Sequence, residues 1–100
     1  EWLDLQGIYS HMAMVDEEPH PLNDIQVDRF VTLLEQLSAA GVRPRWQHIG
    51  NTTGLTHYPR THFNLLRVGC GIVGVKPLAS DPFPTYLRRS LTWKVQLANC

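Results

Sequence analysis

The stretch Leu66-Arg67-Val68-Gly69-Cys70-Gly71-Ile72-Val73-Gly74 decides how the chain is interpreted, because its glycines fit two kinds of ligand site. As a G-x-G-x-x-G motif it resembles a dinucleotide-binding turn, which needs a strand before it and a helix that opens on the glycines. Val75, Lys76 and Pro77 follow instead, and a β-branched residue followed by a helix breaker does not open a helix. The sequence therefore disfavours a dinucleotide site.

The second interpretation is a strand over residues 63–68 that carries Arg67 at its end, followed by a phosphate-binding turn. Glycine has no Cβ, so the amides around Gly69 and Cys70 can approach a single phosphate group closely. We expect this turn to bind an anion.

Size and composition predict one small globular domain: the chain has 100 residues, of which 43% are hydrophobic and 18% charged. Nine basic and nine acidic side chains cancel, which gives no basic surface for nucleic acid or for an anionic membrane. No apolar run approaches the roughly 18 residues that span a bilayer, and no signal peptide is recognisable. We expect a small-molecule partner, with no nucleic acid and no membrane.

The two cysteines, Cys70 and Cys100, form no C-x-x-C pair and no dense framework. This usage favours reduced thiols and a cytoplasmic location. The chain starts at Glu1 without an initiator methionine and stops inside an expected strand, so we interpret it as a piece of a longer protein.

The N-terminal half predicts a strand and a helix. Residues 3–10 mix alternating apolar residues with aromatic and β-branched ones, which is typical of a short buried strand. Apolar residues recur at helical spacing over residues 25–40, with Asn23 or Asp24 as the N-cap and Gly41 just past the end. An exposed loop joins the two elements.

Two more strands follow, at residues 45–49 and 63–68. The order strand, helix, strand, strand predicts parallel βα units and an α/β fold. Prolines mark residues 77–86 as a linker. Strictly alternating apolar residues over 87–100 predict a half-buried strand of a second domain.

Polar residues stand at or just past the expected ends of these strands. Because the carboxyl ends of parallel strands form the functional edge of α/β folds, we expect the residues there to meet in one pocket. A phosphate in that pocket would accept hydrogen bonds from the Thr52 hydroxyl and from main-chain amides, since neutral donors can hold a dianion. The residues are His11, Asn51, Thr52, Arg67, Gly69 and Cys70.

Each residue also has a structural explanation. A histidine at a strand end is often only a hydrogen-bonded structural residue, Asn51 and Thr52 suit a turn or a helix N-cap, and Arg67 suits a carboxylate pair. Their joint occurrence favours the site. We expect no metal at the remaining histidine cluster, because no H-E-x-x-H helix or cysteine pair accompanies His48, His57 and His62.

Four segments resemble, in order and spacing, motifs of the alanine racemase family. The first resembles its T-H-x-A-x-A-D-E segment, the second its next helical element, the third its H-x-A-N-S turn and the fourth its R-x-G-I-x-x-Y-G strand and turn. The matching segments are Ser10-His11-Met12-Ala13-Met14-Val15-Asp16-Glu17, Gln26-x-x-Arg29-Phe30, His48-Ile49-Gly50-Asn51-Thr52 and Arg67-Val68-Gly69-Cys70-Gly71-Ile72-Val73-Gly74.

The resemblance implies an α/β fold that is the last part of a (β/α)8 TIM-type barrel binding pyridoxal 5′-phosphate. Residues 1–76 would be the C-terminal βα units of the barrel and residues 77–86 the linker. Residues 87–100 would begin a C-terminal β domain.

The resemblance also implies roles for the six site residues. Thr52 and the amides of Gly69 and Cys70 would hold the cofactor phosphate, and Arg67 would donate to the pyridine nitrogen. His11 would help to hold that arginine, and Asn51 would orient its neighbours. A guanidinium does not give up its proton, so the ring nitrogen would stay unprotonated and transamination would be suppressed.

This segment departs from the family pattern at Thr52, Cys70 and Val73, where the family has serine, isoleucine and tyrosine, and this leaves substrate preference open. The family's Schiff-base lysine and second-base tyrosine lie outside the segment, since Lys76 and Lys94 stand in other contexts. We therefore expect no catalytic residue here and no activity from the segment alone.

The function that the resemblance implies is interconversion of L-alanine and D-alanine for peptidoglycan synthesis, by a cytoplasmic homodimer. Two alternatives stay open: a racemase of serine or lysine with the same cofactor, and a non-catalytic barrel module that binds pyridoxal phosphate or another phosphate ligand. Sequence outside this segment would distinguish them.

Overall fold

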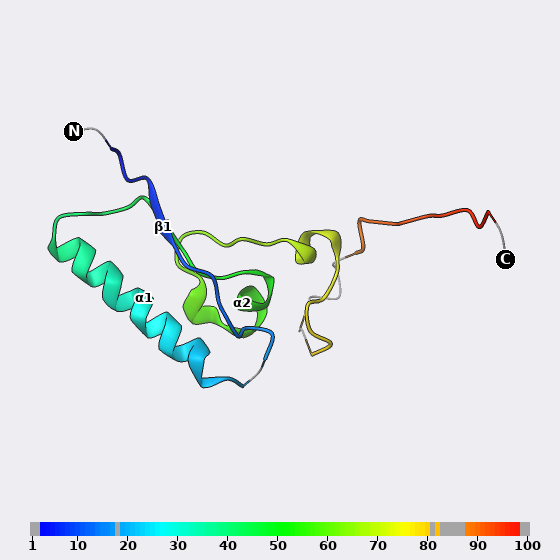
Figure 1. The fold of residues 1–100 in the computed structure, drawn as a ribbon, viewed down its shortest axis with the longest axis horizontal. Coiled ribbons are helices and arrows are strands. Elements are labelled where there is room, and N and C mark those ends of the chain that lie inside the picture. The colour runs from blue at the N-terminus through cyan, green and yellow to red at the C-terminus, as the bar shows by residue number, and fades with distance from the viewer. Residues whose placement is uncertain (1–2, 18, 81, 83–87, 99–100) are drawn as a thin grey trace.

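The computed structural model describes residues 3–17, 19–80, 82 and 88–98. Figure 1 shows the sheet and the longer helices gathered in the first part of the chain, with a short helical turn and an extended segment leading away from them. The elements in chain order are β1 (Gly7–Tyr9), α1 (Pro21–Ala39), β2 (Trp46–His48), α2 (Thr52–His57) and two 3-10 helices, η1 (Pro59–Thr61) and η2 (Cys70–Val73).

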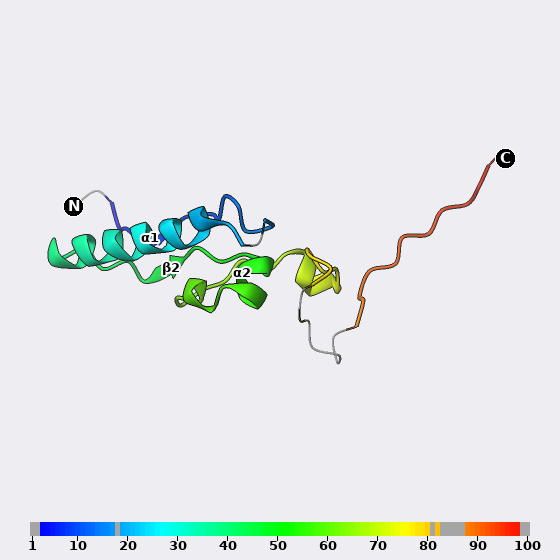
Figure 2. The same cartoon turned by 90° about the horizontal axis from the view of Figure 1, so that it is seen from below.

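The two strands form a parallel sheet, in which Gly7 pairs with Trp46 and Tyr9 with His48. Parallel neighbours need a long crossover connection, and α1 supplies it. Figure 2 shows α1 on one side of β2 and α2 on the other. The predicted α/β character is confirmed.

Strand β1 is shorter than the predicted strand over residues 3–10. Residues 3–6 are not in a strand, and Leu3 and Leu5 are exposed, so the expectation of a buried strand is wrong there. The two strands approach closely at their first pair, since a Cβ on Gly7 would lie 3.1 Å from the Cβ of Trp46.

Helix α1 begins four residues before the predicted start. The Nδ1 atom of His20 accepts a hydrogen bond from the amide of Leu22 at 3.2 Å. Pro21 takes the first helical position, where the missing N–H costs nothing. The prediction of Asn23 or Asp24 as the N-cap is therefore wrong, because both lie inside the helix.

The predicted stop at Gly41 is confirmed. Gly41 has a φ of 78°, its amide donates to the Ser38 carbonyl at 3.0 Å, and the amide of Val42 donates to the Leu37 carbonyl at 2.8 Å. This is the Schellman arrangement, which needs a left-handed residue that glycine adopts without steric cost.

Residues 63–68 are not a strand, although they run beside β2. The side chain of Asn64 takes bonds that a strand backbone would make: its Oδ1 accepts from the Gln47 amide at 2.8 Å, and its Nδ2 donates to the Arg45 carbonyl at 2.8 Å. Further along, the Arg67 amide donates to the Gly50 carbonyl at 3.1 Å. The chain therefore follows β2 without forming a ladder, and the strand prediction is wrong.

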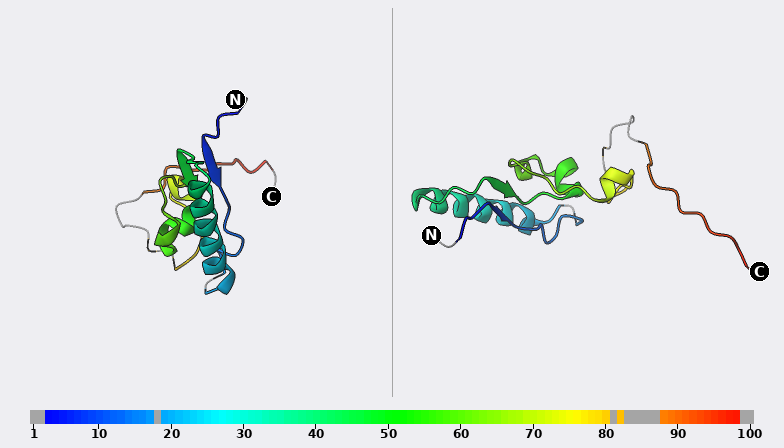
Figure 3. Two further views of the ribbon diagram at one scale, coloured as in Figure 1. Left: turned by 90° about the vertical axis from the view of Figure 1, so that its left-hand side faces the viewer. Right: turned by 90° about the horizontal axis from the view of Figure 1, so that it is seen from above.

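The strand predicted over 87–100 is not formed in its described part, residues 88–98. No described residue pairs with this segment as a strand, and Figure 3 shows it leading away from the sheet. Its alternating apolar side chains are exposed rather than half-buried, because nothing in the described part of the chain covers them. The exposed fractions are 59% for Leu91, 85% for Trp93, 75% for Val95 and 76% for Leu97.

Part of this C-terminal region lies outside the described residues, namely 81, 83–87 and 99–100. The predicted linker at 77–86 and the ends of the predicted strand fall partly on them. The domain boundaries therefore stay predictions.

A small core packs α1 against the loop that follows β1 and the loop that follows β2. Its buried apolar side chains are Met12, Val15, Val27, Phe30 and Ile49. Phe30 meets the partly buried Phe63 edge to face, with ring centroids 5.1 Å apart. The packing thereby holds the loop after β1 and the loop after β2 in fixed positions.

Asn23 adds a buried polar tie, since its side chain is fully buried. Its Nδ2 donates to the Met14 carbonyl at 3.0 Å and to the Tyr58 hydroxyl at 2.7 Å.

No helix among the described residues is both long and apolar enough to cross a membrane.

Candidate functional site

One hollow of about 300 Å³ lies beyond the carboxyl ends of β1 and β2. This is at the lower end of the usual size of small-molecule sites, about 300–1,000 Å³. The structure brings all six sequence-predicted residues to it, together with three that the sequence analysis did not assign to the site. The lining residues are His11, Asp16, Asn51, Thr52, Thr53, Arg67, Gly69, Cys70 and Pro77.

Thr52 and Gly69 meet at one end of the hollow. Thr52 opens α2 and is 4% exposed, and its Oγ1 accepts a hydrogen bond from the Gly69 amide at 3.2 Å. A hydroxyl that accepts from one group still has a proton to donate to another. The Thr52 hydroxyl can therefore donate to an anion while Gly69 holds it in place.

Cys70 follows directly and begins η2. The first N–H groups of a helical turn find no carbonyl partner within that turn. These amides add main-chain donor capacity beside Thr52. Cys70 is partly buried, and its thiol is free.

Asn51 has a structural role in addition to its place at the hollow. Its Oδ1 accepts a hydrogen bond from the Gly54 amide at 2.9 Å, and it is the N-cap of α2. The N-cap interpretation of Asn51 is confirmed. The cap fixes the start of α2 and with it the position of the next residue, Thr52.

Arg67 occupies the centre of the polar network. Its Nη2 donates to the Ser10 carbonyl and to Nδ1 of His11, both at 2.9 Å, and its Nη1 donates to Nδ1 of His48. A guanidinium offers donors only, so both imidazole nitrogens must accept. The contacts of Arg67 within the described residues include no carboxylate, so the alternative of a simple carboxylate pair is not what the structure shows.

The ring of Tyr9 also contacts this guanidinium. The Cζ of Arg67 lies 5.4 Å from the Tyr9 ring centroid, within the range of a cation–π contact. The same ring stacks on His48 with centroids 5.2 Å apart. Arg67 is thus held by groups from both strand ends.

His48 is a site residue that the sequence analysis missed as such. Burial, and then the positive charge of Arg67, lower the pKa of His48 below its usual 6.5. The imidazole is therefore neutral at neutral pH, with its Nδ1 lone pair directed at the guanidinium. The available signal was its position at the end of a strand, three residues before Asn51.

Gly50 allows residues 61–66, which lead to Arg67, to pack closely against the chain just after β2. A Cβ there would lie 2.5 Å from Cδ2 of Leu66 and 2.7 Å from Oγ1 of Thr61, which is fully buried. The Gly50 carbonyl also accepts from the Arg67 amide at 3.1 Å. A side chain at this position would displace the segment that carries Arg67.

Gln26 ties α1 to the loop that carries His11. Its Oε1 accepts from the Ala13 amide at 3.0 Å, and its Nε2 donates to the Ser10 hydroxyl at 3.1 Å and to the His11 carbonyl. Asp16 is held from the other side, since its Oδ1 accepts from the Thr53 hydroxyl at 3.0 Å. The loop after β1 is thus fixed at both of its ends.

The three histidines considered for a metal do not form a site. No group of three histidine, cysteine or acidic side chains in the described part of the chain is placed to hold a metal ion. His48 binds Arg67 instead. The Nε2 of His62 lies 3.0 Å from the Leu55 carbonyl, near the end of α2.

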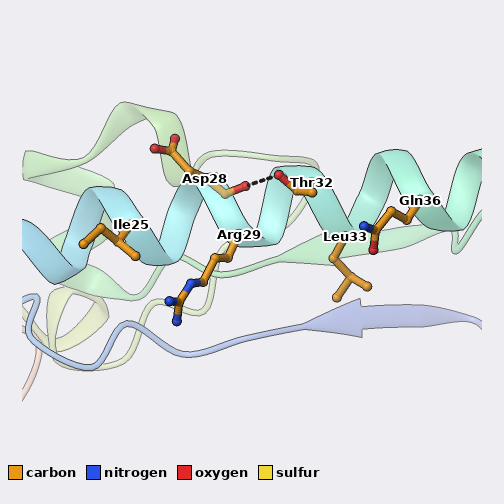
Figure 4. Close-up of a pocket in the computed structure, with 6 residues that line it drawn as sticks. All are labelled: Ile25, Asp28, Arg29, Thr32, Leu33 and Gln36. Atoms are coloured by element: carbon orange, nitrogen blue, oxygen red, sulfur yellow. Dashed lines mark hydrogen bonds between the residues drawn. The ribbon is translucent and has the colours of Figure 1, made fainter.

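A second hollow of about 310 Å³ lies on the outer face of α1. Figure 4 shows its lining side chains, all from this one helix, with the Thr32 hydroxyl bonded to the Asp28 carbonyl at 3.0 Å. None of the six predicted site residues lines it. We therefore assign the candidate site to the hollow beyond the two strands, where polar groups from separate segments converge.

Comparison with known proteins shows the family of this chain. A family model described as "Alanine racemase, N-terminal domain" matches residues 1–77. The chain belongs to this family. Within it, the chain is 35% identical over 95 residues to an alanine racemase of Symbiobacterium thermophilum, which covers 95% of the chain and 25% of that relative.

Solved alanine racemases share the fold of the matched part. The enzyme of Streptomyces coelicolor A3(2) is 36% identical, with a TM-score of 0.69 over 72% of the chain and 19% of its own length. The alanine racemase of Streptomyces lavendulae is 38% identical, with a TM-score of 0.69 over 73% of the chain and 19% of its own length. The chain thus spans about a quarter of the length of the curated relatives it matches.

Proposed function

We propose that this chain is part of a pyridoxal phosphate-dependent alanine racemase and supplies the groups that hold the phosphate and the ring nitrogen of the cofactor. In this proposal the chain is the last part of a (β/α)8 barrel, and the intact protein is a cytoplasmic homodimer that makes D-alanine for peptidoglycan. The observation that carries it is the meeting of Thr52, Gly69 and Arg67 on one hollow.

The donor set fits the two polar ends of such a cofactor. At one end, the Thr52 hydroxyl and the amides that open η2 are neutral donors of the kind that bind phosphate dianions in turns. At the other end, Nη1 of Arg67 has two N–H groups and one partner, His48, among the described residues. Its second N–H can meet an acceptor nitrogen on a ring.

When bound, pyridoxal phosphate withdraws electrons from the Cα of an amino acid, so that the Cα proton can be removed and returned. Arg67 keeps its own proton, because a guanidinium is not deprotonated in proteins. It therefore offers a hydrogen bond without transferring charge to the ring nitrogen, which favours return of the proton to Cα over transamination. His11 and His48 hold the guanidinium in that orientation.

Thr52 has a separate task at the phosphate end. The Asn51 cap fixes the first turn of α2, and the Gly69 amide fixes the hydroxyl oxygen. The position of the phosphate would in turn fix how far the ring reaches toward Arg67. Binding and orientation are the contribution of this chain, since the Schiff-base lysine and the second-base tyrosine of the family lie outside it.

The test uses the whole protein that contains this chain. We expect cofactor titration to give a visible absorbance band and to give racemisation of alanine, measured by polarimetry, faster than that of serine or lysine. Faster racemisation of serine or lysine would select the first alternative. Cofactor binding without racemisation of any of the three would select the non-catalytic module, and absence of cofactor binding would refute the proposal.

A further inference from the structure

Residues 88–90 contact η2, the turn that carries Cys70 at the phosphate end of the hollow. The Ser90 hydroxyl donates to the Ile72 carbonyl at 3.3 Å, and the Ser90 amide donates to the Val73 carbonyl at 3.4 Å. Both acceptors belong to η2. The segment thus contacts η2 through two bonds from one residue.

Gly74 permits this contact. It has a φ of 75°, and a Cβ on it would lie 2.8 Å from the Cα of Arg89 and 3.0 Å from the Arg88 carbonyl oxygen. These are backbone atoms, which cannot rotate aside as a side-chain tip can. The two backbones therefore approach closely only because position 74 is glycine.

Hydrogen bonds within the contacted turn link its front to its back. The Ile72 amide donates to the Gly69 carbonyl at 3.0 Å, and the Val75 amide donates to the Cys70 carbonyl at 3.0 Å. Gly69 and Cys70 line the hollow, while Gly74 and Val73 meet the 88–90 segment. A displacement at the back of the turn is therefore passed to the amides at its front.

We infer that Ser90 is a positioning residue for the phosphate end of the site, acting through η2 on the amides of Gly69 and Cys70. Ser90 does not line the hollow, so it acts on the ligand through the turn and not by contact. The inference rests on the proposed function, since it assigns the front of the turn to the cofactor phosphate.

The test compares pyridoxal phosphate with pyridoxal, which lacks the phosphate group, as ligands of the cofactor-free whole protein. Dissociation constants come from absorbance or fluorescence titration. Ser90→Ala should weaken binding of pyridoxal phosphate by about three- to tenfold, the usual range for one lost hydrogen bond, and leave pyridoxal unchanged. Ser90→Thr keeps the hydroxyl and should restore the wild-type ratio.

Two further variants frame this result. Gly74→Ala should weaken pyridoxal phosphate by about tenfold or more, because a left-handed conformation disfavours alanine and the backbone contact blocks the methyl group. Ser38→Ala, at an exposed position near the end of α1, is the matched control and should change neither constant.

The outcomes separate this inference from the proposed function. If the unaltered protein does not bind pyridoxal phosphate more tightly than pyridoxal, both fail. If it does, but Ser90→Ala leaves the ratio of the two constants unchanged or weakens both ligands equally, the positioning role of Ser90 is overturned while the proposed function stands.

Discussion

The Nη2 atom of Arg67 donates to Nδ1 of His11 at 2.9 Å, which links two residues 56 positions apart in the chain. The bond joins the segment after α2 to the loop that follows β1. Together with the contact to His48, it places one cation where both strands end. The orientation of Arg67 is therefore set by two imidazoles and not by a carboxylate.

Arg67→Lys tests this arrangement. An ammonium cannot reach two imidazoles and a carbonyl at once, because it lacks the planar fork of a guanidinium. We expect a loss of about 1.5–3 kcal/mol in the free energy of unfolding, measured with urea, as for hydrogen bonds to charged groups. In the whole protein, the ratio of racemisation to transamination should fall.

Arg29→Lys is the matched control, because Arg29 is exposed on α1. It should leave stability and the product ratio unchanged. An Arg67→Lys protein with an unaltered product ratio would contradict the role given to the guanidinium.

Thr52→Ala tests the phosphate end. The change removes the hydroxyl that the Gly69 amide holds at 3.2 Å, so the cofactor should bind about three- to tenfold more weakly in a titration. Thr52→Ser keeps the hydroxyl and should bind normally. Thr32→Ala, at an exposed threonine on α1, is the control, and equal weakening by both alanine variants would contradict the assignment.

His48 predicts a specific dependence of stability on pH. Burial, followed by the charge of Arg67, lowers the pKa of His48 in the folded protein below 6.5. Between that lowered value and 6.5 the unfolded chain binds more protons than the folded one. This contribution to stability is therefore constant above pH 6.5 and is lost as the pH falls below 6.5 toward the lowered pKa.

His48→Gln checks this dependence. Glutamine can still accept a hydrogen bond from Arg67 through its carbonyl oxygen, but it does not titrate. Urea unfolding of both proteins from pH 8 to pH 5 should show the stability of the parent falling toward that of the variant on acidification. A stability difference that is the same at every pH would show that His48 does not titrate as described.

Asn23 predicts an order of destabilisation. Asn23→Leu removes the hydrogen bonds that the buried amide donates to the Met14 carbonyl and to the Tyr58 hydroxyl, and should cost about 1–3 kcal/mol of unfolding free energy. Asn23→Asp should cost more, because it also buries a carboxylate. Tyr58→Phe removes one of the two bonds and should cost least, and any other order in urea unfolding would contradict the buried tie.

Local sequence signals predicted the elements whose causes are local. The C-terminal end of α1 was predictable because Gly41 supplies the left-handed residue that this helix end needs. Its N-terminal end was missed because Asn23 and Asp24 are stronger N-cap residues than His20. Pro21, which suits the first helical position, was the unused signal for the true start.

Errors arose where a side chain replaced the backbone or where burial depends on a partner. Residues 63–68 have a strand-like composition, but the side-chain amide of Asn64 makes hydrogen bonds that the backbone would make in a strand ladder. The alternation over 91–97 indicates a strand only when another layer covers one face, and none of the described residues does so. The periodicity of apolar residues reveals neither the role of the Asn64 side chain nor the lack of a covering layer.

The six site residues could be placed together because the rule that parallel strands share a functional edge is geometric. The seat of Arg67 could not be predicted from the same rule. It depends on the stacking of Tyr9 on His48, a contact between neighbouring strands that becomes visible only once the register is known.

The pairing of β1 with β2 has a consequence for the order in which the elements form during synthesis. Gly7 pairs with Trp46, so β1 leaves the ribosome well before its partner β2 has been made. Helix α1 lies between them and needs only contacts within itself to start forming, whereas the pairing must close a long loop. During synthesis, the helix is therefore ready first, and the completed crossover delivers β2 to a waiting strand.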